Sequence, residues 1–349
     1  MRVKASVLGH FGEGENLLNG QTVKTKIITE ELQNQLGQDQ VLKIDTHGGW
    51  KILLKAPFQV LQALRRSTNV LIFPAHNGLR VYAPLLSFQR NFFKNRKIHY
   101  VVIGGWLPLF LLKRKGLTKI LKNFDGIYVE TNTMKSALEA QGFENVLVMP
   151  NCKKLTVLSE KELVFPSGAP YRLCTFSRVM REKGIEDAVN AVMTVNKILG
   201  HQAYELDIYG QVDASQTEWF NALQNKFPSY IRYGGWVPFE KSVDVLKDYF
   251  ALLFPTYYEG EGFAGTLIDA YSAGVSVIAS DWKYNSELVN ESVGCVYPTG
   301  DQFAFVELLK AAAENPDMLL SKKRFCVKEA EKYRIDKAVQ ILIEQMGRD

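Results

Sequence analysis

The sequence is poor in cysteine and has no hydrophobic run long enough to cross a bilayer. Its 349 residues contain four cysteines without CxxC spacing, namely Cys152, Cys174, Cys295 and Cys326. This pattern argues against a disulfide framework or a zinc site, so we expect a reducing, cytoplasmic environment. The longest apolar run, Tyr100–Leu112, is interrupted by two glycines and a proline, and it is shorter than the about 20 residues of a spanning helix. The N-terminal apolar run is also too short for a signal peptide.

Charge is divided unevenly along the chain, although the net charge is only +5. Residues 1–160 contain 22 Lys and Arg against 11 Asp and Glu, a balance of +11, whereas the remainder has 20 against 26, a balance of −6. A chain longer than roughly 250–300 residues tends to split into domains. We therefore expect domains over 1–160 and 161–330, and a C-terminal helix over 331–349 that packs back on the first domain.

Short β-branched runs alternate with helical patterns, which indicates βαβ units and parallel sheets. The strand candidates are Val3–Leu8, Val41–Ile44, Val70–Phe73, Tyr100–Ile103, Ile127–Val129 and Val146–Met149, and then, after a Pro- and Gly-containing linker at 150–170, Arg172–Phe176, Leu206–Tyr209, Ile231–Tyr233, Leu252–Pro255 and Val275–Ala279. The predicted fold class is α/β, with two doubly wound domains that face each other across a cleft. Ligands of such sheets bind at the carboxyl ends of the strands.

The stretch Tyr258–Ser280 carries the most chemical information. Glu261 and Asp269 are eight residues apart, and glycines between them let the backbone approach a ligand closely. Thr266–Ala273 has a helical pattern, and the free amides at its start are suited to a phosphate. By itself the stretch is equally compatible with a glycine turn before a helix and two solvated acids.

A second stretch, Phe176–Gly184, places two cations after a strand. Arg178 follows the strand directly, and Lys183 comes five residues later, where the next helix begins. We expect both in an exposed cleft, where they would stabilise the charge of a diphosphate leaving group. The alternative is that both are solvated surface cations.

Together the two stretches resemble glycosyltransferase family 4, closest to its bacterial polysaccharide-assembly members. That family has the acidic motif Glu, seven residues, Glu within a pattern like EGFGLPxLEAMAxGxPVIAS, and this chain reads EGFAGTLIDAYSAGVSVIAS from Glu261 to Ser280. FSRVMREKG resembles the family's cationic GR(x4)KG segment. The resemblance covers about Tyr171–Tyr333 well, and it is weaker in the first half, where it rests on the order of elements, on 19–22 (NGQT) and on 150–151 (PN). It implies the GT-B fold, in which two Rossmann-like domains face each other.

The resemblance also implies roles for individual residues. Arg178 and Lys183 would hold the donor diphosphate, Glu261 would contact the transferred sugar, and Asp269 would bind the ribose hydroxyls. The remaining implied donor-binding residues are Gly262, Phe263, Ala264, Gly265, Thr266, Gly210, Val237 and Gly20. Gly20 would lie in the first strand–helix loop of the first domain, close to phosphate and acceptor.

Two departures from the family pattern bear on the site. The second acid is Asp269 rather than Glu, so the ligand or the helix must come closer. Many relatives also have a histidine in the first domain, but at that strand end this chain has Ile103-Gly104-Gly105-Trp106. His76, after the preceding strand, is the one candidate to replace it, and a solvated loop histidine is the alternative.

The implied reaction is front-face sugar transfer with retention of configuration. No DxD-type segment is present to hold a metal on the diphosphate, so we expect a metal-independent enzyme without a cofactor, in which cations and helix amides stabilise the leaving group. We expect a UDP-sugar donor, with a GDP-sugar as second choice. The expected acceptor is a saccharide or a lipid-linked saccharide in cell-surface polysaccharide assembly.

Three other functions fit parts of the sequence. An NAD-dependent oxidoreductase would share the fold class, but the GxGxxG fingerprint is absent. A GT-B epimerase or phosphorylase would share the cleft. A nucleic-acid or membrane-binding module could use the basic first half.

Residues 90–122 suggest peripheral contact with an anionic membrane, because basic and apolar side chains alternate there. The expected contacts are Arg90, Lys94, Arg96, Lys97, Lys113, Arg114, Lys115, Lys119 and Lys122, with Phe92, Phe93, Trp106, Leu107, Phe110 and Leu111. A partly buried strand with a solvated cationic face is the alternative.

Overall fold

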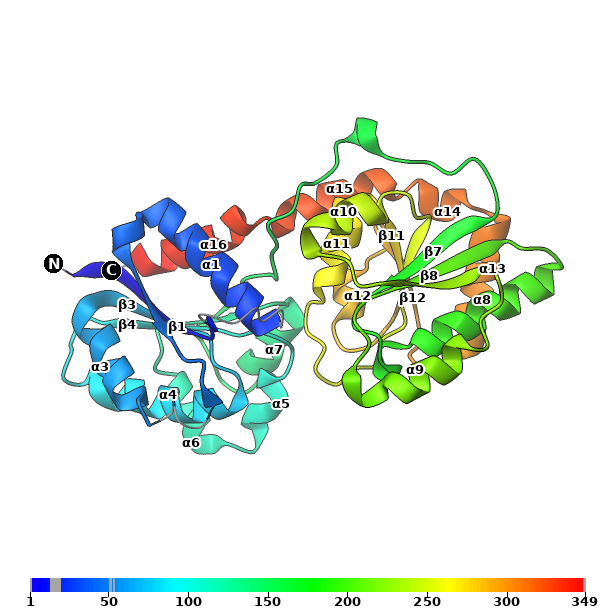
Figure 1. Ribbon diagram of the computed structural model, residues 1–349. Coiled ribbons are helices and arrows are strands. Elements are labelled where there is room, and N and C mark those ends of the chain that lie inside the picture. The colour runs from blue at the N-terminus through cyan, green and yellow to red at the C-terminus, as the bar shows by residue number, and fades with distance from the viewer. Residues whose placement is uncertain (1, 13–19, 50–51, 53, 348–349) are drawn as a thin grey trace. The chain divides into compact units, whose positions relative to one another are not determined.

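The computed structural model describes residues 2–12, 20–49, 52 and 54–347 (Figure 1). The chain divides into two compact units, one formed by Met1–Lys154 with Arg334–Asp349 and the other by Leu155–Tyr333. We call them unit 1 and unit 2. Each contains one six-stranded sheet in which all pairings are parallel. The predicted α/β class with two doubly wound, Rossmann-like units is confirmed.

Unit 1 is built by strands that alternate with helices. Its elements are β1 (Val3–Gly9), α1 (Gly20–Leu36), β2 (Val41–Asp45), α3 (Ala56–Arg66), β3 (Ser67–Ile72), α4 (His76–Arg90), β4 (Lys97–Val101), α5 (Leu107–Leu112), α6 (Lys115–Leu121), β5 (Gly126–Val129), α7 (Asn132–Glu139), β6 (Val146–Val148) and the C-terminal α16 (Ile335–Gly347). The sheet order is β2-β1-β3-β4-β5-β6. Strand β2 is added on one side of β1 and the later strands on the other side, so the switch point of this sheet lies between β1 and β3.

Two layers of helices cover the sheet of unit 1. Helices α1 and α16 lie on one face, and α3, α4 and α6 lie on the other (Figure 1). Ile28 and Leu32 of α1 and Val339 and Leu342 of α16 are fully buried in one apolar cluster with β1. This packing explains why a helix at the far end of the chain belongs to the first unit.

Unit 2 repeats the alternation with a different strand order. Its elements are β7 (Tyr171–Phe176), η3 (Arg181–Lys183), α8 (Ile185–Leu199), β8 (Tyr204–Tyr209), α9 (Thr217–Gln224), β9 (Ile231–Gly235), α10 (Ser242–Leu246), β10 (Ala251–Phe254), α11 (Gly265–Ser272), β11 (Ser276–Ser280), α12 (Asn285–Leu288), β12 (Gly294–Tyr297), α13 (Gln302–Glu314), α14 (Asp317–Leu320) and α15 (Lys323–Ala330). The order β12-β11-β10-β7-β8-β9 puts its switch point between β7 and β10. In open α/β sheets ligands bind beyond the carboxyl ends of the strands at such a point.

The two faces of the second sheet have separate apolar cores. Helices α8, α9 and α13 pack on one face, and α10, α11 and α15 pack on the other. Helix α8 follows the predicted apolar spacing, because its buried side chains recur at three- and four-residue intervals from Ile185 to Val195. The helix stops at Gly200, which adopts the left-handed conformation with φ 71°.

The observed strands differ from the sequence prediction at several ends, and one strand was not predicted. Strand β3 begins at Ser67 rather than Val70, and β8 begins at Tyr204 rather than Leu206. Strand β4 begins at Lys97 rather than Tyr100, because polar His99 is buried and satisfied by Tyr128 Oη at 3.0 Å and Asn69 Oδ1 at 3.2 Å. Strand β12 was not predicted, since its sequence is short and begins with glycine.

Among the described residues, no helix is both long enough and apolar enough to span a membrane. Leu107 and Leu111, two residues expected at the membrane, are 0% and 2% exposed and belong to the core.

Candidate active site

The candidate site lies in unit 2, where the segments after β7 and β10 meet. Lys183 ends the short η3 helix after β7, and Glu261 lies in the loop after β10. Gly184 makes this meeting possible, because a Cβ built there would lie 2.1 Å from the Pro255 carbonyl oxygen and its φ is 69°. Only glycine permits that approach and that conformation without strain. The turn at Gly184 thus brings the cationic and the acidic motif together at the switch point of the sheet.

Lys183 and Glu261 form a mostly buried ion pair. The Nζ of Lys183 lies 2.5 Å from Oε2 of Glu261, and the two side chains are 12% and 8% exposed. Thr256 Oγ1 donates a second hydrogen bond to the same oxygen at 2.9 Å. The ammonium also lies over the rings of Tyr258 and Phe254, 5.0 and 5.7 Å from their centroids. The expectation that Lys183 lies in an exposed cleft is therefore wrong, because its ammonium is paired with an acid, lies over two rings, and belongs to a side chain that is only 12% exposed.

The burial of Glu261 separates it from a second glutamate two residues earlier. Glu259 has 80% of its side chain exposed and pairs with Lys283, whereas Glu261 is 6% exposed. Both are followed by glycine, so the sequence pattern alone does not distinguish their environments. The structure identifies Glu261 as the acid held inside the candidate site.

Arg178 has a looser environment than Lys183. Its NH1 lies 3.6 Å from Oδ2 of Asp213, and 55% of its side chain is exposed. Hydrogen bonds from Ser215, and secondarily the nearby guanidinium, lower the pKa of Asp213 below its usual value. Exposed pairs of this kind contribute about 0–1 kcal/mol. The guanidinium is therefore held weakly and is accessible to an anion.

The glycine-rich segment ends at the first turn of α11. Gly262 and Phe263 are buried, Ala264 and Gly265 are partly buried, and α11 begins at Gly265 without a side-chain cap. Thr266 is 8% exposed, and its hydroxyl is buried with no hydrogen-bond partner in the described structure. A helix start attracts anions through its amides and its dipole. The orphaned hydroxyl adds a donor that an incoming ligand oxygen would satisfy.

Asp269 lies one turn further along α11. It is 2% exposed, and its Oδ1 accepts a hydrogen bond from Ser242 Oγ at 3.0 Å. Ser242 begins α10, so the contact joins the segment after β9 to α11. Sequence reasoning missed both Ser242 and Thr256. Thr256 had a detectable signal, because it is a polar residue two positions after a buried strand, whereas Ser242 had none.

The remaining predicted donor-binding residues occupy separate positions. Gly210 follows β8 with φ 138°, and a Cβ there would lie 1.8 Å from the Ser177 carbonyl oxygen, next to Arg178. Val237 is partly buried in the segment after β9. Gly20 is the first residue of α1 in unit 1, and an added Cβ there would meet no atom within 4 Å.

His76 lies in a pocket of unit 1. It is the first residue of α4, and its ring centroid is 3.9 Å from that of Trp106. Burial, and then the nearby Arg114, lower the pKa of His76. The pocket has a volume of about 490 Å³ and lies at the switch point of the first sheet, where His10 and Gln21 also line it. Sequence analysis did not single out His10, whose ring hydrogen-bonds to His47 at 2.7 Å and to Thr22 at 2.7 Å.

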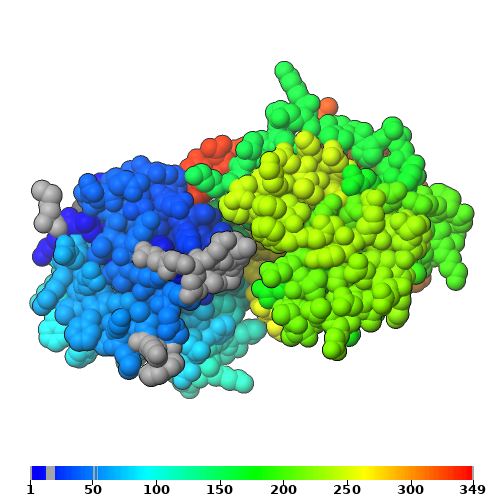
Figure 2. All heavy atoms as spheres, in the orientation of Figure 1, coloured from blue at the N-terminus to red at the C-terminus, as the bar shows by residue number. Residues whose placement is uncertain are grey.

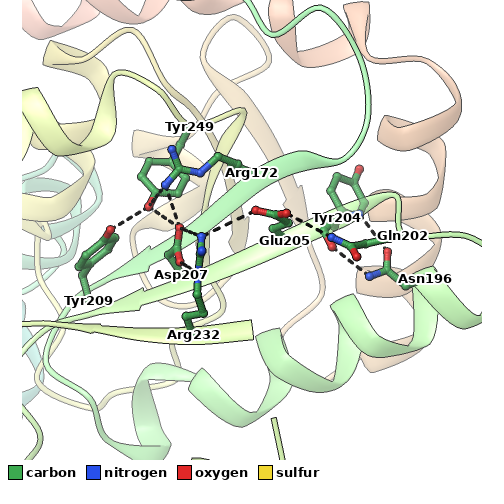
Figure 3. Close-up of polar contacts among 9 residues, drawn as sticks. All are labelled: Arg172, Asn196, Gln202, Tyr204, Glu205, Asp207, Tyr209, Arg232 and Tyr249. Atoms are coloured by element: carbon green, nitrogen blue, oxygen red, sulfur yellow. Dashed lines mark hydrogen bonds and ion pairs between the residues drawn. The ribbon is translucent and has the colours of Figure 1, made fainter. Parts of the chain in front are cut away.

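A second polar cluster in unit 2 has the properties of a structural network (Figure 3). Asp207 of β8 accepts hydrogen bonds from Tyr249 at 2.7 Å, from Arg172 at 3.0 Å and from Arg232 at 3.0 Å. Burial alone would raise the pKa of Asp207, but these three bonds outweigh it and lower the pKa. Since two donors come from the neighbouring strands β7 and β9 and the third, Tyr249, lies two residues before β10, the cluster ties the sheet together. We do not assign it to the candidate site.

Comparison with known proteins agrees with the fold and with the motif in unit 2. Residues 170–315 match the family model described as Glycosyl transferases group 1. The chain is 30% identical over 167 residues to the UDP-N-acetylglucosamine–peptide N-acetylglucosaminyltransferase GtfA subunit of Streptococcus agalactiae, over 47% of this chain and 32% of that protein. The chain spans about a third of the length of the curated relatives it matches.

Solved structures extend the similarity to both units. Sucrose-phosphate synthase from Thermosynechococcus elongatus has a TM-score of 0.74 at 14% identity over 98% of both chains. Anabaena HepE in complex with UDP has a TM-score of 0.73 at 13% identity over 99% of both chains. The fold is therefore GT-B, and residues 170–315 match the model of glycosyl transferases group 1. The predicted resemblance to GT-B glycosyltransferases is confirmed at this level, and assignment to family 4 stays a prediction.

Proposed function

We propose that this protein is a retaining glycosyltransferase that moves a sugar from a UDP-sugar to a saccharide or lipid-linked saccharide acceptor in glycan assembly. The observation that carries the proposal is the enclosed Lys183–Glu261 pair at the β7–β10 switch point. It lies inside the segment that matches the glycosyltransferase family. A cation and an acid at that place suit the two halves of a nucleotide sugar, the diphosphate and the sugar hydroxyls.

The proposal assigns the diphosphate to the positive end of the site. Lys183 and Arg178 would bind its oxygens, and the amides of Gly265 and Thr266 at the start of α11 would add neutral donors. The Thr266 hydroxyl would gain the partner it lacks in the described structure. Because the leaving diphosphate gains negative charge as the bond to the sugar breaks, these donors would bind the transition state more strongly than the substrate.

Glu261 and Asp269 would divide the recognition of the rest of the donor. Glu261 would accept hydrogen bonds from hydroxyls of the transferred sugar, while Thr256 and Lys183 hold its carboxylate in place. Asp269, oriented by Ser242, would accept from the ribose hydroxyls. Gly210 and Val237 would line the base. UDP is favoured over GDP because the name of the curated relative specifies UDP-N-acetylglucosamine and HepE was solved with UDP.

Transfer with retention would proceed on one face of the sugar. The bond from the anomeric carbon to the phosphate oxygen breaks, the acceptor oxygen bonds to that carbon, and the acceptor proton passes to the departing phosphate oxygen. No protein nucleophile is required, which fits a Glu261 carboxylate already engaged by an ammonium and a hydroxyl. Gly20 and the pocket beside His76 in unit 1 would serve the acceptor.

The decisive experiment incubates the purified protein with separate UDP- and GDP-sugars and measures release of free UDP or GDP. We expect slow hydrolysis of one UDP-sugar and faster nucleotide release when a saccharide acceptor is added. NMR of the product should show the same anomeric configuration as in the donor. An Arg178→Ala variant should release nucleotide roughly 100-fold more slowly. No release from any nucleotide sugar, with or without acceptors, would overturn the proposal, and an inverted anomer would overturn retention.

A further inference from the structure

The loop after β10, which carries Glu261, is held by the loop that follows β11. Strands β10 and β11 pair in parallel, so their carboxyl ends lie at the same edge of the sheet. The yellow part of unit 2, which includes α11, packs directly against the green part in the space-filling view (Figure 2). A contact between the two loops can therefore act on residues of the candidate site.

The indole of Trp282 holds the turn that presents Glu261. The turn runs from Tyr258 to Glu261, and the Glu261 N–H donates a hydrogen bond to the Tyr258 carbonyl at 3.1 Å. The Trp282 Nε1–H donates to the same carbonyl at 2.8 Å. The ring of Tyr258 also lies below the Lys183 ammonium, 5.0 Å from it. Tyr258 thus joins the β11 loop to both members of the buried ion pair.

The side chain of Lys283 holds the next residue of the same turn. Its ammonium donates a hydrogen bond to the Glu259 carbonyl and lies 3.2 Å from Oε2 of the Glu259 carboxylate. Although Lys283 is a long cation in a loop, only 16% of its side chain is exposed. We call the contacts of Trp282 with Tyr258 and of Lys283 with Glu259 the clasp.

The backbone of Lys283 adopts a conformation that favours glycine. Its φ is 51°, and among the described residues Asn95 is the other non-glycine residue with a positive φ. For a residue with a β-carbon this conformation is unfavourable, and it persists only where surrounding contacts enforce it. Glycine would adopt it without that strain but would lack the ammonium. The strain is therefore connected with the contact that the Lys283 side chain makes beside the candidate site.

We propose that Trp282 and Lys283 are positioning residues that set the place of Glu261 for the sugar of the donor. Lys183 and Thr256 hold the Glu261 carboxylate, and the clasp holds the backbone of the turn that carries it. This inference rests on the proposed function, in which Glu261 binds the transferred sugar. Loss of the clasp should therefore weaken binding of a UDP-sugar but not of UDP, since the ribose and the phosphates are assigned to other residues.

Three substitutions test the clasp, and a fourth is the matched control. Trp282→Phe keeps an aromatic ring and removes the indole N–H. Lys283→Gly removes the ammonium and suits the positive φ, so that relief of backbone strain offsets the lost contact and the protein should melt within about 4 °C of wild type. Lys283→Arg keeps a cation for Glu259. Trp219→Phe is the control, because the Trp219 indole donates to Glu186 at 3.1 Å and makes no contact with the turn.

The measurement is calorimetric titration of each variant with UDP, UDP-glucose, UDP-galactose and UDP-N-acetylglucosamine. Trp282→Phe and Lys283→Gly should bind the UDP-sugar that wild type prefers roughly tenfold more weakly, at the low end of the loss of a charge-assisted hydrogen bond, and should bind UDP within about twofold of wild type. Lys283→Arg and Trp219→Phe should bind both ligands as wild type does. In a Glu261→Ala background, loss of the clasp should have no further effect on UDP-sugar binding, because the clasp acts through Glu261.

Three results would overturn the role of the clasp alone. Equal losses of affinity for UDP and for the UDP-sugar would show general damage to the site, and thermal unfolding checks that each variant is folded. Unchanged UDP-sugar binding by Trp282→Phe and Lys283→Gly would show that neither residue positions Glu261. A further loss in the Glu261→Ala background would show that the clasp does not act through Glu261. If wild type binds neither UDP nor any of the three sugar nucleotides, the proposed function fails, and the inference fails with it.

Discussion

Removing the charge of Lys183 should damage stability and catalysis together, and a second substitution should restore only stability. Lys183→Met keeps the aliphatic stem that lies beside Tyr258 and Phe254 and removes the ammonium. The Glu261 side chain, 8% exposed, would then be buried with the Thr256 hydroxyl as its remaining side-chain hydrogen-bond donor among the described residues. Breaking a buried pair by removing one partner costs about 3–5 kcal/mol.

The residual exposure of both side chains favours the lower end of that range, about 3 kcal/mol. For a unit of roughly 150–250 residues, 1 kcal/mol shifts the Tm by about 2–4 °C, so unit 2 of Lys183→Met should melt about 6–12 °C below wild type. Replacing both partners removes the uncompensated charge. We therefore expect Lys183→Met/Glu261→Gln to recover most of the lost stability.

Differential scanning calorimetry of wild type, both single variants and the double variant measures this cycle, and nucleotide release from the donor is measured on the same samples. All three variants should be nearly inactive in transfer, including the restabilised double variant. Arg178→Ala is the matched control, since its exposed pair with Asp213 contributes little. It should melt within about 2 °C of wild type and still lose activity. A Lys183→Met protein as stable as wild type, or a double variant no more stable than Lys183→Met, would refute the reasoning.

Four further outcomes follow from the candidate site and its surroundings. Asp269→Ala should weaken UDP binding by roughly 10–150-fold, because charge-assisted hydrogen bonds contribute about 1.5–3 kcal/mol, whereas Glu261→Ala should reduce transfer and leave UDP affinity nearly unchanged. Calorimetric titration of both variants with UDP measures this, and equal losses of affinity would contradict the separate roles of Asp269 and Glu261. Thr266→Val should be at least as stable as wild type, since the buried Thr266 hydroxyl lacks a hydrogen-bond partner among the described residues. The same change should weaken UDP binding by roughly five- to tenfold, and an unchanged affinity for UDP would count against a phosphate contact at Thr266. Activity should persist in excess EDTA, and a loss that manganese or magnesium reverses would contradict metal independence. Burial lowers the pKa of Lys323 from 10.5 to about 8, so between pH 8 and 10.5 the unfolded chain binds more protons than the folded one. Wild type should therefore gain stability relative to Lys323→Met as the pH rises through this range. A difference in unfolding free energy between the two proteins that does not change with pH would contradict this.

The sequence was most informative where residues that are local in the chain also lie at strand ends. Arg178 and Lys183 follow β7 within one short segment, and Glu261 follows β10. Parallel strands bring their carboxyl ends to one edge, so recognising strands and motifs was enough to bring these residues together. The two doubly wound sheets followed from the same alternation of strands and helices.

Exposure and exact partners depended on contacts that periodicity does not encode. Burial of Lys183 follows from the tight approach of Gly184 to Pro255. The acidic motif had already singled out Glu261, but only the structure shows that its side chain is buried while that of Glu259 is exposed. The start of β4 was misplaced because buried His99 finds two polar partners across the sheet, so a polar residue occupies a core strand. Such satisfied polar groups are indistinguishable in sequence from solvated ones.

The unequal environments of the two cations would let the proposed site be stable and still bind a diphosphate. Were both cations enclosed like Lys183, an incoming phosphate would have to separate two buried pairs, each costly to break. Were both exposed like Arg178, water would screen them and weaken their effect on the leaving group. In the proposed site, Lys183 would stay with Glu261 and would need only to donate one further hydrogen bond, to a phosphate oxygen. Arg178 would exchange Asp213 for phosphate at a cost of at most about 1 kcal/mol. Loss of Lys183 should therefore appear in both stability and turnover, and loss of Arg178 in turnover alone.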